Sequence, residues 1–315
     1  DDAGENVELI SDTVEFEMDG AIEMLRDDLS HGLFRNIGGA RGVVGSESTT
    51  AVTLADAEDV VFFEIGQEIT CSEDDGADSG DALRGSGAAV TLTEVDREGG
   101  ILTASTTWTT TISGLEATDF LFVEGDFASK MSGFDGYIPA SAPGSTAYFG
   151  VDRSVDTRLG GLRTSQTGVP LEQGLLKASA LASRWGAKLD LGFMNPIDWN
   201  DLQTSLESSS GRHRTMTVNG TGDAARFGFE ALIIDGPNGK PIRLISDPSC
   251  QKDVVWLLQE DTWKLRYSGD SLVRMVDDDG SILMREATND GVELRTKFRG
   301  NMTCEAPGHN IRVAI

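Results

Sequence analysis

Residues 170–186 read PLEQGLLKASALASRWG, and this stretch carries the most weight in assigning a fold because it predicts one well-defined helix. Pro170 stands in the first turn, where a missing N–H is harmless, and Gly186 is a natural stop. An apolar stripe with spacings of three or four residues runs through Leu171, Leu175, Ala178, Ala182 and Trp185. We expect a long structural helix that packs this stripe against strands.

A second helix is predicted to begin at Asn195. This asparagine is a favourable N-cap, Pro196 suits the first helical position, and Asp198 can serve as the acid of a capping box. The apolar side of this helix would consist of Trp199, Leu202 and Leu206.

Residues 11–34 predict an N-terminal amphipathic helix, with Asp12 and Glu15 as its capping box and Gly32 as its stop. Its apolar face comprises Val14, Met18, Ile22, Leu25, Leu29 and Leu33. The polar face is strongly acidic, so an anionic membrane would repel it. We expect this helix to pack against its own subunit or a neighbouring one.

Short strands are predicted between the N-terminal helix and residue 130. They are Val60–Ile65, Ala88–Val95 and Ile101–Thr111, and the last two are joined by a glycine-containing turn at residues 96–100. The run from Thr103 to Thr111 has high β-propensity and few apolar residues. We therefore expect an exposed β arm here.

The second half of the chain also predicts strands, after a polar linker at residues 208–223. These strands are Phe227–Ile234, Ile242–Ile245, Val254–Leu258, Thr262–Tyr267, Ile282–Glu286, Val292–Phe298 and Ile311–Ile315. The pattern predicts an α+β protein in which a long helix lies against antiparallel strands.

Charge and composition limit the function. The chain has 315 residues with 52 Asp and Glu against 26 Lys and Arg, a net charge of −26, which excludes a protein built to neutralise nucleic-acid phosphates. Hydrophobic residues make up 39% of it, enough for a sizeable core, and no apolar run is long enough to cross a bilayer. The sequence starts at Asp1, so we expect a segment upstream of it.

No pattern of residues predicts chemistry. Cys71, Cys250 and Cys304 lack metal-ligand spacing, which favours a reduced compartment, and the serines lack a nucleophile-elbow motif. His31 is expected to stabilise a helix end, and His213 is expected to be a solvated loop residue. His309 lies close in sequence to Cys304, but two potential ligands do not make a metal site. The acidic runs at residues 73–81 and 277–280 do not fit an EF-hand and are expected to be exposed turns. We expect a protein that is not an enzyme, with no catalytic, cofactor-binding or metal-binding residues.

The order of these elements resembles the major capsid proteins of tailed bacteriophages, which share the HK97-type fold. The similarity covers residues 135–315 best. It is carried by Gly150–Ser154, Arg158–Gly161, Trp185-Gly186, Met194-Asn195-Pro196 with Trp199 and Leu202, the hairpin from Phe227 to Asp247, Val255–Gln259, Trp263–Leu265, Asp279-Gly280 and Cys304–Asn310.

The resemblance implies an HK97-like division into an N-terminal arm, an extended β loop, a P-domain with a long spine helix and an A-domain. By position these are residues 1–50 for the arm and amphipathic helix, 51–134 for the extended β loop or small β insertion, 135–190 for the P-domain with the spine, 191–272 for the A-domain and 273–315 for the return to the P-domain. It also implies hexamers and pentamers that close into an icosahedral shell around double-stranded DNA, in a virion assembled in the host cytoplasm. A portal, a scaffold or protease and cement proteins are the implied partners, without a membrane or sequence-specific DNA binding.

Two alternatives stay open: an encapsulin-type protein compartment, and a β-rich decoration or binding protein. Some members of the resembled family join a loop lysine covalently to a neighbouring asparagine. This chain has no lysine between residues 50 and 129, so we expect a shell without such cross-links.

Overall fold

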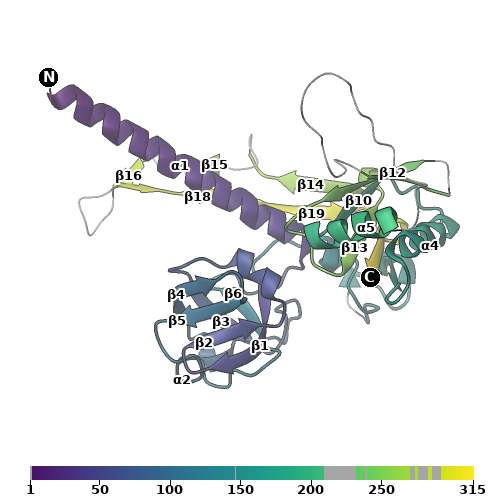
Figure 1. Cartoon of the computed structure of the whole chain (residues 1–315), viewed down its shortest axis with the longest axis horizontal. Coiled ribbons are helices and arrows are strands. Elements are labelled where there is room, and N and C mark those ends of the chain that lie inside the picture. The colour runs from purple at the N-terminus through teal and green to yellow at the C-terminus, as the bar shows by residue number, and fades with distance from the viewer. Residues whose placement is uncertain are drawn as a thin grey trace. The chain divides into compact units, whose positions relative to one another are not determined.

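The computed structural model describes residues 2–145, 147–208, 232–237, 240–269, 274–275, 283–285 and 292–315. The chain forms two compact units: one is Arg35–Gly136, and the other combines residues 1–34 with Tyr137–Ile315. Helices and strands are mixed, as an α+β class requires (Figure 1). The four-residue helix α3 (Phe134–Tyr137) lies where one unit passes to the next.

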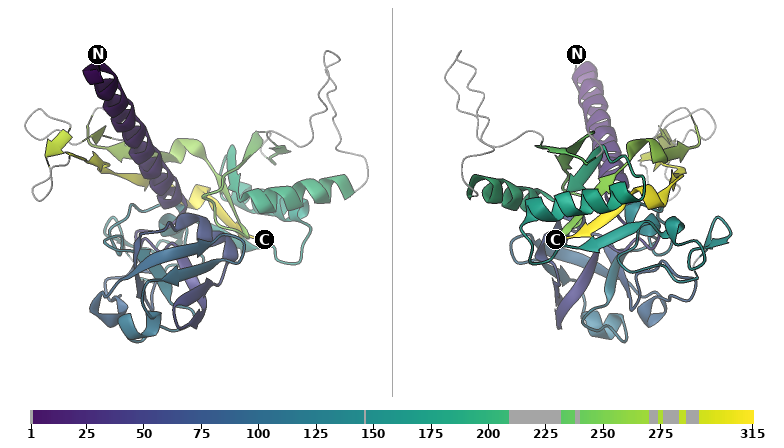
Figure 2. Two further views of the ribbon diagram at one scale, coloured as in Figure 1. Left: turned by 60° about the vertical axis from the view of Figure 1, so that its left-hand side comes forward. Right: turned by 90° about the vertical axis from the view of Figure 1, so that its right-hand side faces the viewer.

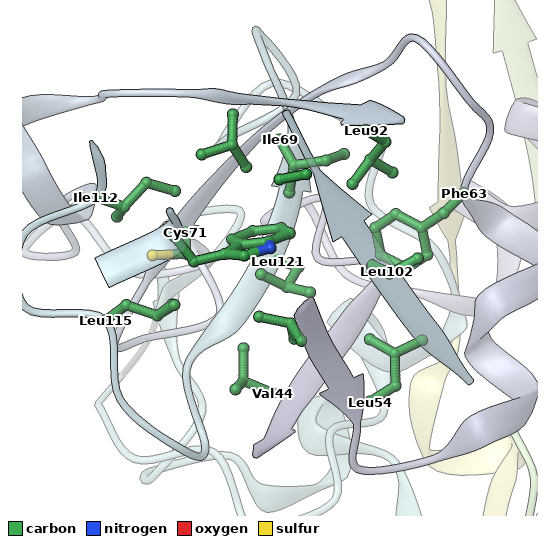
Figure 3. Packing of buried hydrophobic residues seen from close by; sticks show 14 of the residues in the cluster. Val44, Leu54, Phe63, Ile69, Cys71, Leu92, Leu102, Ile112, Leu115 and Leu121 are labelled. Atoms are coloured by element: carbon green, nitrogen blue, oxygen red, sulfur yellow. The ribbon is translucent and has the colours of Figure 1, made fainter. Parts of the chain in front are cut away.

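Arg35–Gly136, which we call the barrel unit, is a closed six-stranded barrel. Its strands follow the order β1-β2-β5-β4-β3-β6, and every pair is antiparallel. The bounds are β1 Gly42–Ser48, β2 Ala51–Leu54, β3 Glu68–Ser72, β4 Val90–Asp96, β5 Ile101–Ala104 and β6 Phe120–Val123. Because the barrel is closed, every strand has a hydrogen-bonded neighbour on both sides and no edge strand is left. The interior is a continuous apolar core that includes Leu102 and Leu121, both fully buried (Figure 3).

The strand predicted at Val60–Ile65 is wrong, because a helix N-cap at Asp56 outweighs the β-propensity of the residues that follow. Residues 57–62 form a short 3₁₀ helix, Ala57–Phe62, where a strand at Val60–Ile65 was expected. Asp56 caps this helix by accepting a hydrogen bond from the Glu58 N–H at 3.1 Å. Another 3₁₀ turn spans Arg84–Ser86.

The threonine-rich run is also not one strand. The hairpin at residues 96–100 is confirmed, since Asp96 pairs with Ile101, but β5 ends at Ala104 and Trp108–Thr111 forms the short helix α2. The break turns Trp108 into the barrel, where it is fully buried and its Nε1 donates to the Thr50 carbonyl at 3.0 Å. The threonines therefore cover a filled barrel, and the expectation of an exposed β arm needing a partner is wrong.

The second unit contains a six-stranded mixed sheet in the order β11-β12-β10-β13-β20-β9. The bounds are β9 Leu162–Ser165, β10 Leu191–Met194, β11 Leu232–Asp235, β12 Pro241–Ser246, β13 Val254–Leu258 and β20 Ile311–Ala314. β10 runs parallel to β12, and β20 runs parallel to β9. These two parallel pairs depart from the predicted antiparallel strands, whereas the other neighbours in the sheet are antiparallel.

Helices α4 (Leu171–Arg184) and α5 (Pro196–Ser208) pack on one face of this sheet (Figure 2). The predicted stripe of α4 is confirmed at Leu175, Ala178 and Ala182, which are fully buried, but Pro170 is the N-cap and Trp185 is 57% exposed. α4 has 14 residues. The start of α5 is as predicted, with the Asn195 side chain accepting from the Ile197 N–H at 2.9 Å.

The long helix is α1 (Asp2–Phe34), with 33 residues, which begins well before the predicted Asp12 and runs through Gly32. The predicted apolar face is half-buried from Met18 onward. At its end, Phe34 packs edge-on against Phe193 of β10, with ring centroids 5.5 Å apart. Neighbouring residues of β10 face α4 and α5, so α1 ends on the opposite face of the sheet.

Three separate two-stranded pairs, which we call the ribbon, complete the second unit (Figure 1). It consists of three antiparallel pairs: β14 Trp263–Tyr267 with β19 Gly300–Cys304, β15 Arg274–Met275 with β18 Thr296–Lys297, and β16 Leu283–Arg285 with β17 Val292–Leu294. A small hairpin joins β7 (Ala147–Tyr148) and β8 (Val151–Asp152). Short 3₁₀ helices span Thr157–Gly160, Glu260–Thr262 and Pro307–His309.

The remaining sequence predictions can be compared with these elements. The strands expected at residues 242–245, 254–258, 262–267 and 311–315 are confirmed within a residue or two, and β11 confirms the last part of the strand expected at 227–234. His213, most of the linker at 208–223 and the acidic run at 277–280 lie outside the described residues. Within the described residues, every helix is either too short or too polar to cross a bilayer.

Candidate interaction surface

A groove on the second unit is the candidate functional site. It has a volume of about 510 Å³ and is lined by two loops, residues 156–163 and 305–309, and by Trp185. The loops are far apart in sequence, and each contains a short 3₁₀ helix. Trp185 is the C-cap residue of α4, so the end of that helix directs an exposed indole to the rim.

The first loop is held by an aspartate–arginine pair. The Asp156 carboxylate accepts two bonds from the Arg158 guanidinium, from Nε and Nη2, both at 3.0 Å. These bonds hold the pKa of Asp156 below its usual value. Arg158 is 77% exposed, so its charge reaches the groove rim.

The two loops meet backbone to backbone. A Cβ at Gly308 would lie 2.8 Å from the Arg158 carbonyl oxygen, closer than any real contact allows. Gly161 has a φ of +70°, and a Cβ there would lie 2.8 Å from two atoms of Ile138. Glycine at position 308 therefore lets the two groove walls approach, and glycine at position 161 lets the first wall pack on Ile138.

Asn310 fastens the second loop to the sheet. This residue is fully buried, and its Oδ1 accepts from the Gln259 N–H at 2.8 Å and from Trp263 Nε1 at 2.9 Å. Its Nδ2 donates to Thr262 Oγ1 at 3.0 Å and to the Ala306 carbonyl at 2.9 Å. One amide thus joins β13, β14 and the loop that forms the groove wall.

Two buried tyrosines tie residues 137–153 to the ribbon. The Tyr137 hydroxyl donates to the Met302 carbonyl, and the Tyr148 hydroxyl donates to the Cys304 carbonyl. The two rings lie edge to face at 5.9 Å, and the Arg153 guanidinium lies 5.1 Å from the centre of the Tyr148 ring. Burial raises the pKa of Tyr148, so this hydroxyl stays protonated and acts as a donor.

The sequence next to the groove exposes large apolar side chains. Val155 is 82% exposed and immediately precedes the first loop, and Phe149 and Val151 on the β7–β8 hairpin are 77% and 47% exposed. Phe149 also has a φ of +48°, which is uncommon for a residue with a side chain. Exposed aromatic and aliphatic side chains beside arginine are typical of protein interfaces.

Charge is distributed unevenly along the chain. Residues 1–34 contain 11 acidic residues and one arginine, and residues 35–136 contain 19 acidic and five basic residues. Residues 137–189 contain six basic and three acidic residues, whereas residues 190–315 contain 14 basic and 19 acidic residues. Residues 137–189 are therefore cationic in a strongly acidic protein, but the groove itself is close to neutral, because Asp156 and Glu305 line it beside Arg158 and Arg163.

Ion pairs inside the barrel unit use all five of its cations. These pairs are Arg35–Asp59, Arg41–Asp126, Lys130–Asp126, Arg84–Asp119 and Arg97–Glu64. The surplus acids of this unit are therefore left to face solvent or a partner.

The histidines and cysteines considered from sequence have structural surroundings. His31 is buried in the last turn of α1, and His309 belongs to the groove wall. Cys304 is buried, and its Sγ lies 3.6 Å from Asn310 Nδ2. Burial raises the pKa of Cys71 to about 12 and that of Cys304 to about 11, so neither is a thiolate at neutral pH.

Aspartates of the acidic run at residues 73–81 accept hydrogen bonds from nearby residues. Asp75 accepts from the Asn36 side chain at 2.6 Å and from the Ala77 N–H at 3.0 Å, and Asp81 accepts from the Asp78 N–H at 3.1 Å. Across the described residues, no three His, Cys, Asp or Glu side chains are grouped to hold a metal ion.

Asp198 differs from its predicted role as the acid of a capping box. Its Oδ2 accepts from the Asp253 N–H at 3.0 Å, which joins the first turn of α5 to the loop before β13. Asp198 is only 4% exposed, and desolvation raises its pKa to about 6. The hydrogen bond from the Asp253 N–H opposes this rise in pKa, as does Lys252, whereas the negative charges of Asp253 and Asp201 add to it.

Sequence reasoning missed the groove because its walls come from residues about 150 positions apart. The available signals were the tryptophan placed at a helix end and the local surplus of arginine.

Comparisons with known proteins include a distant likeness to a solved structure. Neither a family model nor a curated protein matches the sequence. Among solved structures, the chain is similar to one described as "Cyanophage A-1(L) capsid asymmetric unit", with a TM-score of 0.40 and 11% sequence identity. The match covers 57% of this chain and 59% of that chain, so less than two thirds of the neighbour is spanned. We therefore build the function on the residues of this chain.

Proposed function

We propose that this chain is the major capsid protein of a tailed bacteriophage and self-assembles into an icosahedral shell around double-stranded DNA. The sequence resemblance to HK97-type capsid proteins suggests the role. The proposal includes hexamers and pentamers as the building units. It also includes a portal, a scaffold or protease and cement proteins as partners.

The groove and its surroundings carry the proposal. Trp185, Val155 and Phe149 are large side chains that a soluble monomer has little reason to expose, and all three lie in the cationic segment of an acidic chain. Tryptophan and arginine are the residues that most often dominate binding energy at protein interfaces. A second copy of the chain is the partner that we propose for this surface.

The net charge suits a container for DNA. A charge of −26 per subunit repels phosphate, so packaged DNA would stay free of the wall unless cations intervene. The same charge opposes association of subunits, so close contacts at the groove must overcome it. The role needs no catalytic residue, and we propose that the protein is not an enzyme. It would reside in the virion capsid after assembly in the host cytoplasm.

The test is the size and content of what the full chain forms. We expect closed particles of megadalton mass in electron micrographs and by sedimentation. A monomer or trimer at every concentration and salt tried would contradict the proposal and favour a decoration or binding protein. Shells purified from infected cells should protect DNA from nuclease. A folded protein cargo in its place would favour an encapsulin-type compartment.

A further inference from the structure

The loop between β12 and β13, residues 247–253, joins two helices of the second unit to the sheet, and we call it the joint loop. Ser249 Oγ lies 2.9 Å from the Oγ of Ser30, near the end of α1. The Cys250 carbonyl accepts from Asn195 Nδ2 at 3.0 Å, directly before α5. The position of this loop therefore decides how the end of α1 is fastened to the rest of the unit.

One buried carboxylate holds the C-terminal end of the joint loop. Asp198 lies in the first turn of α5 and is 4% exposed, and its Oδ2 accepts from the Asp253 N–H at 3.0 Å. Asp253 has a φ of +58°, a left-handed conformation that is uncommon for a residue with a side chain. The loop therefore has a less favoured backbone conformation at the point where the carboxylate holds it.

The charged groups around Asp198 compensate its ionised form poorly. They are Asp201 on its own helix, and Asp253 and Lys252 on the joint loop. Two carboxylates outnumber one ammonium group, and burial removes most of the hydration of Asp198. Desolvation, and to a lesser degree the two aspartates, raises the pKa of Asp198 to about 6, although the bond from the Asp253 N–H opposes this rise.

We propose that the joint loop is a pH-sensitive fastener that holds the end of α1 more firmly in acid than at neutral pH. When the loop opens, water reaches Asp198 and its pKa returns toward the ordinary value of 3.8. The closed loop therefore binds the proton more tightly, and its extra stability is lost as pH rises through about 6. Because Ser249 contacts Ser30, opening of the loop also loosens α1. This inference does not depend on the proposed capsid role.

Hydrogen exchange of the full chain, followed by mass spectrometry of peptides from residues 247–256 and 25–34, tests the fastener. After correction for the intrinsic pH dependence of exchange, protection of the joint loop should fall about 50-fold between pH 4 and pH 7.5. The reason is that the affinity of Asp198 for its proton differs about 100-fold between the closed and the open loop. The end of α1 should lose protection over the same range. Constant protection of both peptides would overturn the inference.

Two amide substitutions in α5 identify the group that titrates. Asp198→Asn keeps the shape and the acceptor without the charge, so protection of the loop should vary less than about three-fold over this range. Asp201→Asn is the matched control, because it removes one carboxylate from the same helix; the fall should persist with its midpoint at slightly lower pH. An Asp198→Asn chain that keeps the original pH dependence would show that the inference is wrong. If circular dichroism shows that this variant does not fold, the midpoint of Asp201→Asn decides, and a midpoint that stays in place or rises contradicts the inference.

A third variant tests the coupling to α1. Ser249→Ala removes the hydroxyl that contacts Ser30, so the loop should keep its pH dependence while the end of α1 becomes insensitive to pH. An unchanged response of α1 would show that this contact does not fasten the helix. His31 is also buried near the end of α1, and a histidine gains its charge as pH falls. Loosening of α1 in acid would therefore assign the effect to His31 and overturn the role of Asp198.

Discussion

Replacing Asn310 by alanine tests whether one buried amide holds the groove wall to the sheet. The substitution removes the acceptor for the Gln259 N–H and for Trp263 Nε1, and the donor for Thr262 Oγ1 and the Ala306 carbonyl. All of these groups lie in the second unit, so the barrel unit should be unaffected.

The size of the effect follows from the groups left without partners. A buried donor that loses its acceptor costs about 1–3 kcal/mol, so two donors cost roughly 2–6 kcal/mol. Trp263 is only half-buried and water can reach its indole more easily, which favours a value of about 3 kcal/mol. For a unit of this size, each kcal/mol shifts the melting temperature by about 2–4 °C, which gives a decrease of roughly 6–12 °C.

Differential scanning calorimetry of the full chain measures this shift. The control is Asn200→Ala, which removes an exposed asparagine of α5 and should change the melting temperature by less than about 2 °C. If Asn310→Ala behaves like this control, the amide is not the fastener of the groove wall. A loss of association by Asn310→Ala below its melting temperature would show that the wall must be held in place for assembly.

Three further predictions concern the units, a buried acid and covalent links. Leu102→Ala should cost about 2–5 kcal/mol and lower only the calorimetric transition of the barrel unit, whereas Val255→Ala should lower only that of the second unit; a common shift would contradict independent units. Asp198 has a raised pKa of about 6 in the folded chain, so its ionisation should reduce the unfolding free energy as pH rises from 4 to 7; Asp198→Asn should flatten this dependence in urea titrations, and an unchanged slope would refute it. Boiling in denaturant with reductant should give one band near 33.7 kDa, and a ladder of larger bands would show covalent cross-links.

The helices of the second unit could be predicted because their signals are local. Asn195 and Pro196 mark the start of α5, and the spacing of Leu175, Ala178 and Ala182 marks the buried side of α4. Trp185 was assigned to the same stripe by spacing alone. It lies at the C-cap, where the helical direction of side chains is lost, and it points outward instead.

The barrel unit was harder to predict because its strands are short and closed by distant pairing. β1 pairs with β6 across more than 70 residues, and no local pattern reports this. The 3₁₀ helix at Ala57–Phe62 did have a readable signal, since Asp56 is an N-cap and Glu58 and Asp59 are acids of the first turn. The valines and phenylalanines that follow favoured a strand, but the N-cap correctly indicated a helix.

The candidate site shows a similar division between local and distant information. The charge of residues 137–189 could be read from the sequence, because a surplus of basic residues needs only a count. The shape of the groove could not be predicted from the sequence, because Gly308 and Arg158 meet only after β20 and β9 pair side by side.

Charge repulsion and apolar attraction between copies act over different distances. Two acidic copies repel each other over distances comparable to the Debye length, about 10 Å at 0.1 M salt. Contacts between exposed apolar side chains such as Trp185, Val155 and Phe149 act only at short distance and are screened little by salt. Moderate salt therefore weakens the long-range repulsion more than the short-range attraction. In this way a chain with a charge of −26 can associate through short-range apolar contacts once moderate salt weakens the repulsion between copies.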